Sequence, residues 1–245
     1  MKRMISALLA LILVLGLCGC SGNKSVSGTV TPRETEPEKT GSTETAPAET
    51  EAASDALVDG EVSLGEMQGG VYTNAYAGFG CELDERWSFK TAEELQDLSQ
   101  LTDDMLQDST IADSRYTTIT DMMAESYELL ASINVNYTLL SVSDRVTFST
   151  ISEETLIDAT LLQKDNMIQS YAQAGIQVSS MEKAQVSFLG EQHYAIHTVA
   201  TIEDTPYYLI QLFCFNLGGQ YNVTLTLATY VEDNTASLLE LFYPV

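Results

Sequence analysis

The stretch that decides the fold is Tyr207–Tyr230, YYLIQLFCFNLGGQYNVTLTLATY, in which two apolar runs flank Gly218-Gly219. A pair of glycines between such runs predicts a two-residue hairpin turn, because the central residues of that turn need positive φ angles. The turn sets the register and leaves one face of the hairpin wholly apolar. The pairs expected on that face are Cys214 with Val223, Leu212 with Leu225, and Ile210 with Leu227.

The opposite face of this hairpin mixes aromatic, apolar and polar side chains. The same register pairs Leu209 with Ala228, Gln211 with Thr226, Phe213 with Thr224, and Phe215 with Asn222. Such a face is either covered by a helix or left open for a partner.

Upstream of the hairpin, short apolar runs alternate with helical patterns. Further strands are expected over residues 71–76, 78–83, 117–125, 132–142, 185–189 and 192–202. Glu94 follows Thr91 at the capping-box spacing and predicts a helix from Ala92 towards Leu101. A second short helix is expected within the acidic residues 102–113.

The same capping-box spacing recurs at Thr150 and Glu153, where it predicts the start of the longest helix, ending at Gly175. A short helix is also expected over residues 235–242. The element order therefore predicts an α/β (α+β) fold, in which an antiparallel sheet packs against a long helix accompanied by further short helices.

The first residues carry an export signal. Lys2 and Arg3 precede an apolar run over residues 4–17, which is shorter than the roughly 20 residues that a spanning helix needs. The run ends in Leu17-Cys18-Gly19-Cys20, which resembles the lipobox of bacterial lipoproteins. That resemblance implies cleavage before Cys20 and attachment of a diacylglycerol with palmitate-type acyl chains to its sulfur as a thioether. The alternative is an ordinary signal peptide with incidental cysteines.

Three regions follow from this start. Residues 1–19 are the expected lipoprotein signal peptide, and residues 20–65 carry the lipidated cysteine and an acidic Thr, Glu, Pro and Ser segment without an aromatic residue. Such a segment buries too little apolar area to fold, so we expect a disordered tether or spacer. Residues 66–245 have the size of one globular α/β domain with its own core.

The charge is strongly acidic. The formal net charge is −24, and residues 66–245 hold 26 acidic and six basic residues. This charge repels phosphate backbones and anionic headgroups, which excludes nucleic acid as an expected partner. A basic protein or a polycationic envelope component stays possible, and the alternative is that the acids only keep the protein soluble and monomeric.

A family resemblance lies in the opening of the domain. Val71–Phe79 reads VYTNAYAGF and leads into Leu83–Trp87, LDERW. These stretches are similar to the "Y-x-N-x-x-x-G-F" and "L-P-x-G-W" openings of PsbP-like domains in uncharacterised lipoproteins of anaerobic Gram-positive bacteria, although Asp84 and Arg86 replace the usual proline and glycine. The resemblance implies a binding or accessory domain with protein partners, and it offers no shared catalytic residues.

Candidate chemical sites are few. His193 and His197 would lie about 13 Å apart along a strand, so one metal ion cannot bind both, and they are expected to be hydrogen-bonded sheet residues. Cys81 and Cys214 could form a disulfide in an exported protein, or Cys214 could pack as a small hydrophobic residue. Four aspartates without the spacing of an EF-hand are either a calcium site or, as we expect, a solvated helix face: Asp103, Asp104, Asp108 and Asp113.

The sequence thus predicts a membrane-tethered lipoprotein on the extracytoplasmic face of the cell membrane. It would act as a non-enzymatic binding or accessory domain of the cell envelope, without a cofactor. The alternatives are an envelope hydrolase that uses acidic residues and a small-ligand carrier with a pocket between helix and sheet. Clustered buried carboxylates would favour the hydrolase, an enclosed apolar cavity the carrier, and an exposed aromatic patch a protein partner.

Overall fold

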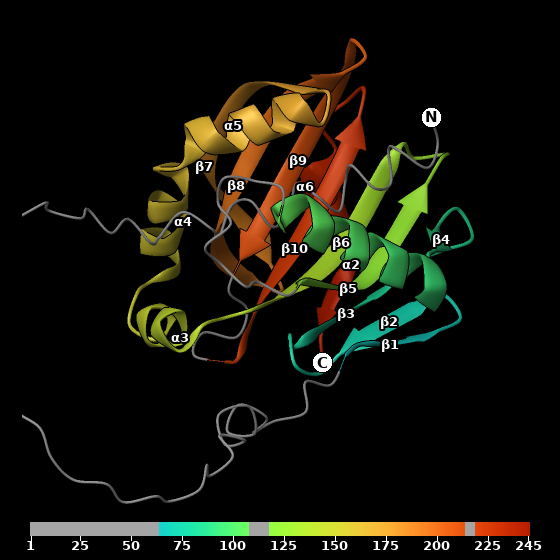
Figure 1. Cartoon of the computed structure of the whole chain (residues 1–245). Helices are drawn as coiled ribbons and strands as arrows, with labels where there is room; N and C mark the ends of the chain where they lie inside the picture. The colour runs from blue at the N-terminus through green and yellow to red at the C-terminus, as the bar shows by residue number, and fades with distance from the viewer. Residues whose placement is uncertain (1–63, 108–117, 214–218) are drawn as a thin grey trace, which may run out of the picture. The chain divides into compact units, whose positions relative to one another are not determined.

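The structure is a computed structural model that describes residues 64–107, 118–213 and 219–245 (Figure 1). The expected signal peptide, the tether and the lipid attachment at Cys20 lie outside these residues. Those expectations therefore stay predictions.

The large sheet has the strand order β4-β5-β6-β10-β9-β8-β7, and all its neighbouring strands are antiparallel. Its strands, in chain order, are β4 (Ser88–Phe89), β5 (Thr118–Ser126), β6 (Ala131–Leu139), β7 (Ile176–Phe188), β8 (Glu191–Ile202), β9 (Thr205–Phe213) and β10 (Tyr221–Tyr230). The β7 strand starts well before the expected residue 185, since Gly175, with a φ of 80°, ends the preceding helix and lets the strand begin at once.

The register that Gly218-Gly219 predicts for the hairpin is confirmed where the structure describes it. Leu212 lies opposite Leu225, Ile210 opposite Leu227, Leu209 opposite Ala228, Gln211 opposite Thr226, and Phe213 opposite Thr224. The expected pairs of Cys214 and Phe215 involve residues outside the described part of the chain.

A small second sheet has the order β1-β2-β3-β11. It consists of β1 (Glu66–Gln68), β2 (Val71–Asn74), β3 (Phe79–Glu82) and β11 (Phe242–Pro244). The expected C-terminal helix over 235–242 is too long, because α6 covers only Thr235–Leu239. Phe242 instead joins β11, where its ring packs against Phe79 and Phe188 at centroid distances of 5.5 Å.

The helices differ from the expected ones in length. They are α2 (Ala92–Gln107), α3 (Val142–Phe148), α4 (Glu153–Leu161), α5 (Lys164–Gln173) and α6. The capping box of α2 is confirmed, since Thr91 N donates to Glu94 Oε2 at 2.8 Å and Glu94 N donates to Thr91 Oγ1 at 3.3 Å. However, α2 runs on to Gln107 as one helix, so the separate short helix after residue 101 was wrong.

The single long helix expected between Thr150 and Gly175 was also wrong. The chain forms α4 and α5 with a break at Leu162, which is 83% exposed, and the cap of α4 is Ser152 rather than Thr150. The sheet below is twisted, and two short helices follow it where one straight helix could not: α4 lies mainly over β8 and α5 over β7. Within the described residues no helix is long and apolar enough to cross a membrane.

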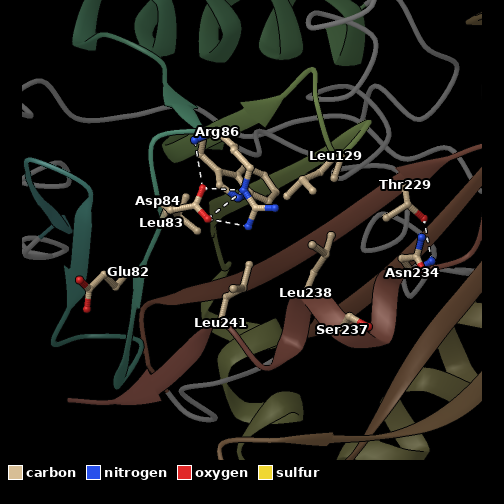
Figure 2. A pocket seen from close by; sticks show the side chains of 12 residues that line it. Glu82, Leu83, Asp84, Arg86, Leu129, Thr229, Asn234, Ser237, Leu238 and Leu241 are labelled. Atoms are coloured by element: carbon tan, nitrogen blue, oxygen red, sulfur yellow. Dashed lines mark hydrogen bonds and ion pairs between the residues drawn. The ribbon is translucent and has the colours of Figure 1, made fainter.

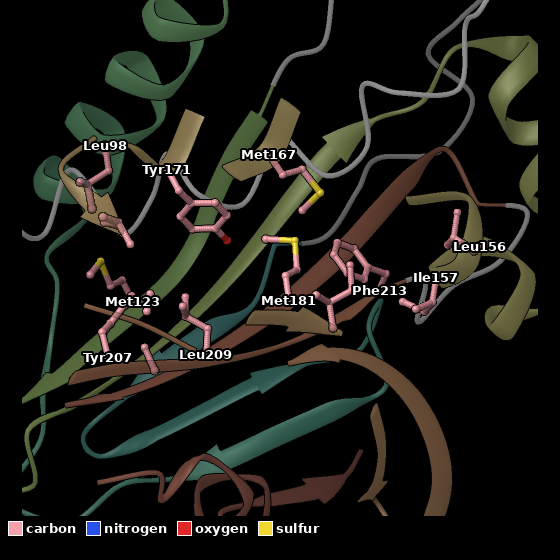
Figure 3. Close-up of a cluster of buried hydrophobic side chains, with 14 of the residues drawn as sticks. Leu98, Met123, Leu156, Ile157, Met167, Tyr171, Met181, Tyr207, Leu209 and Phe213 are labelled. Carbon is pink, nitrogen blue, oxygen red and sulfur yellow. The ribbon is translucent and has the colours of Figure 1, made fainter. Parts of the chain in front are cut away.

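The two faces of the large sheet have different covers. Helices α2 to α5 lie on one face, where Leu98, Tyr171 and Phe213 belong to one buried cluster (Figure 3). The small sheet lies on the other face, where Tyr72 and Asn74 bond to residues of β5 and β6. The fold is therefore α+β, with an antiparallel central sheet between a helical layer and a second sheet.

Candidate functional site

A groove of about 630 Å³ opens on the side of the large sheet that carries the small sheet and α6 (Figure 2). We name it the Trp87 groove, because it contains the single tryptophan of the chain. The β3–β4 loop, the β5–β6 turn, the end of β10 and α6 line it with Glu82, Leu83, Asp84, Arg86, Trp87, Leu129, Ala131, Thr229, Asn234, Ser237, Leu238 and Leu241.

Backbone and side-chain bonds hold the loop that carries Trp87. Leu83 N donates to Gly70 O at 2.8 Å, and Trp87 N donates to Asp84 O at 3.1 Å. The Asp84 carboxylate accepts from the backbone N and the guanidinium of Arg86. Asp84 and Arg86 thus hold the turn by an ion pair, and hydrogen bonds from Arg86 lower the pKa of Asp84.

The opposite wall of the groove is fixed at the start of α6. Asn234 N donates to Thr229 Oγ1 at 3.3 Å, and Thr235 Oγ1 donates to Asp233 Oδ1 at 2.7 Å. His197 Nε2 lies 2.8 Å from Asp233 Oδ2. Partial burial acts to raise the pKa of Asp233, but the bonds from Thr235 and the interaction with His197 hold it below its usual value.

Exposed apolar residues border the groove at one end, and we name them the apolar rim. They are Tyr127, Leu129 and Leu130 in the β5–β6 turn and Val231 after β10. Tyr230 N donates to Leu130 O at 2.9 Å, which brings the two turns together. Leu130 and Val231 have φ angles of 50° and 72°, a region that is strained for leucine and still more so for a β-branched residue.

Carboxylates surround the groove. Those on lining residues or directly beside them in sequence are all exposed: Glu82, Asp84, Glu85, Glu128, Asp233 and Glu240. The cation among the lining residues is Arg86, which Asp84 neutralises. The groove therefore combines apolar surface with a negative border.

A buried carboxylate lies elsewhere, between the two sheets, and sequence reasoning missed it. A β-bulge between Thr120 and Met122 gives Asp121 no partner in the ladder. Its carboxylate accepts from Tyr72 Oη at 2.6 Å, from Asn74 Nδ2 at 2.8 Å and from Gly65 N at 3.0 Å. Burial raises the pKa of Asp121 above its ordinary value even though these three donors act in the opposite direction.

The Y-x-N part of the opening motif supplies this network. Besides bonding to Asp121, Asn74 exchanges hydrogen bonds with the Tyr137 hydroxyl at 2.6 and 2.9 Å and accepts from Ala77 N at 2.8 Å. Gly78 completes the turn with a φ of 77°. The motif thus joins the small sheet to the large one and has a structural role. The partner, Asp121, carries no sequence signal because bulges leave none.

The candidate residues named from the sequence do not come together. His193 Nδ1 lies 3.1 Å from Glu153 Oε1, whereas His197 contacts Asp233, so the two histidines serve different carboxylates. In the described part of the chain, no three His, Cys, Asp or Glu residues form a group that could hold a metal ion.

The cysteine and aspartate candidates are only partly described. Cys81 is a buried free thiol whose pKa burial raises to about 12, and Cys214 lies outside the described residues. Asp103 and Asp104 belong to α2, while Asp108 and Asp113 also fall outside.

Comparisons with known proteins show similarity to solved structures. No family model and no curated protein matches the chain. A solved structure, the cyanobacterial PsbP (CyanoP) of Synechocystis sp., is similar with a TM-score of 0.39 and 14% sequence identity. The match covers 79% of this chain and 99% of that one, and nothing about activity follows from it.

Proposed function

We propose that this chain is a lipid-anchored extracytoplasmic binding or accessory protein whose folded domain docks a cationic, partly apolar polypeptide in the Trp87 groove. The observation that carries the proposal is the apolar rim beside a groove with a negative border. Docking would combine burial of apolar side chains with charge complementarity, the two features that give protein interfaces affinity and specificity.

The backbone of the apolar rim is strained at two residues. Asparagine or glycine would adopt the left-handed backbone at positions 130 and 231 with less strain, yet the chain has a leucine and a valine there, 45% and 52% exposed. Strained backbone of this kind concentrates at functional sites. This supports a role for Leu130 and Val231 as contact residues.

The charge of the groove favours one class of partner. The carboxylates around it would repel an acidic protein and attract a basic one, mainly by raising the rate of association. The pair of Asp84 and Arg86 carries no net charge, so the attraction comes from the other carboxylates around the groove. A segment with alternating basic and apolar side chains therefore fits the groove best.

The hydrolase alternative gains no support from the described residues. Asp121 is the one carboxylate among them that is buried, at 4% exposure, and its oxygens already accept from three donors. Paired carboxylates that divide acid and base roles lie close together, and no second buried carboxylate of the described chain accompanies Asp121.

The test uses the fluorescence of Trp87, the only tryptophan. The full-length chain in detergent is titrated with a peptide of alternating lysine and leucine and with its glutamate–leucine counterpart. We expect a saturable change with the lysine peptide only, weakened by salt. Leu129→Asn should weaken binding at least tenfold, whereas the matched control Leu162→Asn, at an exposed leucine of α4's end, should not.

Equal binding of both peptides, or equal loss of binding in both variants, would show that the groove is not the docking site.

The anchor is tested separately by membrane fractionation. Cys20→Ala should release the chain from membranes during a carbonate wash, because two acyl chains anchor durably and none would be attached. A variant that stays on the membrane would contradict the lipid anchor and leave the groove untouched.

A further inference from the structure

The helix-covered face of the large sheet carries a block of polar side chains, which we name the polar floor. Every second residue of β6 and of β10 points to this face. The floor consists of three pairs opposed across the two strands: Asn222 with Thr138, Thr224 with Asn136, and Thr226 with Asn134. Each of these side chains is at most 2% exposed.

The sequence pattern of the two strands does not match this burial. Alternation of apolar and polar residues along β6 and β10 is typical of strands with one face in water. Here both faces are covered, and the polar positions are as buried as the apolar ones. The floor is thus a polar surface inside the protein.

Much of the floor lacks hydrogen-bond partners. Among the described residues, the amide nitrogen and oxygen of Asn134 and of Asn136 have none, and neither do Asn222 Oδ1 and Thr226 Oγ1. Buried polar groups are almost always paired in native proteins, so a group of unpaired ones needs an explanation. A bound molecule that supplies the missing partners is one.

The chemistry of the floor defines that molecule. All six residues are uncharged, and two lysines elsewhere in the domain are already paired: Lys90 Nζ with Glu125 Oε2 at 2.7 Å, and Lys183 Nζ with Glu154 Oε1 at 2.9 Å. A carboxamide offers a donor and an acceptor side by side and is satisfied by a ligand that does the same. The ligand is therefore neutral and bears hydroxyl or amide groups.

Longer side chains flank the floor. Phe213 lies opposite Thr224, and the Tyr171 hydroxyl lies 3.4 Å from Gln211 Oε1, next to Thr226 on the neighbouring strand. Figure 3 shows Tyr171 and Phe213 on this face with Leu98 of α2. The threonine and asparagine side chains of the floor are shorter than these flanking groups.

We propose that the polar floor binds a small uncharged molecule with hydroxyl and amide groups, of the class of N-acetylated sugars. The floor and the Trp87 groove lie on opposite faces of the sheet, so this proposal stands whether or not the groove docks a polypeptide.

The test measures binding of N-acetylglucosamine to the full-length chain in detergent, by calorimetry and by thermal unfolding. Glucosamine is the control ligand, since it lacks the acetamido group and is cationic. We expect N-acetylglucosamine to raise the melting temperature and glucosamine to leave it unchanged. Asn136→Leu should weaken binding at least tenfold, and Asn166→Leu, at an exposed position of α5, should not.

Circular dichroism establishes that the variants are folded, and Thr226→Val supplies a milder change of the floor should Asn136→Leu not fold. Weaker binding in either floor variant supports the proposal. An absence of any shift with N-acetylglucosamine, or equal binding of glucosamine, would overturn it and leave the floor to ordered water. Equal loss in the Asn166→Leu control would overturn it too.

Discussion

The two faces of the large sheet belong to the same strands, but the side chains buried on them differ in polarity. Towards the small sheet, β6 and β10 present Ile133, Val135, Leu225 and Leu227, all fully buried. Towards the helices, the same strands present the polar floor. One face follows the ordinary rule that apolar residues fill the interior, and the other departs from it over the six floor residues.

The polar groups within the two faces also differ. Asp121, the buried carboxylate between the sheets, has three donors around it, whereas the carboxamides of Asn134 and Asn136 have no partner among the described residues. A satisfied network stabilises the fold and specifies how the sheets meet. A network with unpaired buried groups destabilises the fold. The network of Asp121 therefore stabilises the fold, whereas the unpaired groups of the polar floor lower the stability of a helix face that is otherwise packed with apolar side chains.

The largest expected loss of stability is on the face towards the small sheet, which we name the apolar face. Leu225 is fully buried opposite Leu212, and Leu225→Ala should lower the free energy of unfolding by about 2–5 kcal/mol, because it removes buried methyl groups and leaves a cavity. Urea unfolding of the full-length chain measures this. A loss below about 1 kcal/mol would mean that this face is no better packed than the floor.

The next largest loss of stability is expected from the hydrogen-bond network of Asp121 between the two sheets. Asp121→Asn should cost about 1–3 kcal/mol, since the amide has one acceptor oxygen where the carboxylate has two, so its NH₂ group would face one of the donors, such as Gly65 N. Burial raises the pKa of Asp121 above its ordinary 3.8, so its protonated form favours the folded state. The stability from this group is present below that value and is lost as pH rises through the folded pKa.

The difference in stability between wild type and Asp121→Asn should therefore be largest in acid and narrow as pH rises above about 4. Urea unfolding at a series of pH values gives this curve. The other carboxylates titrate in both proteins and cancel from the difference. A gap that widens with rising pH would show that the three donors outweigh burial at Asp121.

Sequence reasoning found the local features well. The Gly218-Gly219 pair predicted the register of the central hairpin, and Thr91 with Glu94 predicted the start of α2, because both signals act within a few residues. The break at Leu162 was not predictable in this way, since it depends on how two helices follow a twisted sheet. The strand β11 was missed because its pairing with β3 joins distant parts of the chain.

The candidate sites were harder to predict. The mixed face of the hairpin was visible in the pairs of Gln211 and Phe213, but only the structure shows that helices cover it and that the polar positions are buried. The Trp87 groove depends on turns that meet through Tyr230 and Leu130, a contact between residues 100 apart in sequence. Long-range pairing of this kind leaves no local pattern.

A smaller loss of stability is expected from a change at the start of α2, one of the helices on the helix face. Thr91→Ala removes the side-chain acceptor for Glu94 N and should cost about 0.5–2 kcal/mol. The loss should fall on α2, which lies over β5 at the edge of the floor. Hydrogen exchange would therefore show faster opening of α2 than of the small sheet. Equal acceleration in both would mean that the two faces unfold as one unit.

The smallest effect gives the sharpest comparison, because Thr226 adjoins Leu225 on β10 and points to the opposite face. Thr226→Val keeps the shape of the side chain and removes a hydroxyl that is buried and has no partner among the described residues. Removing such a group should leave the free energy of unfolding unchanged or raise it by up to about 1 kcal/mol. Urea unfolding without added ligand measures it beside Leu225→Ala. A clear loss would show that the hydroxyl has a protein partner in solution, and that the floor stabilises the fold as the apolar face does.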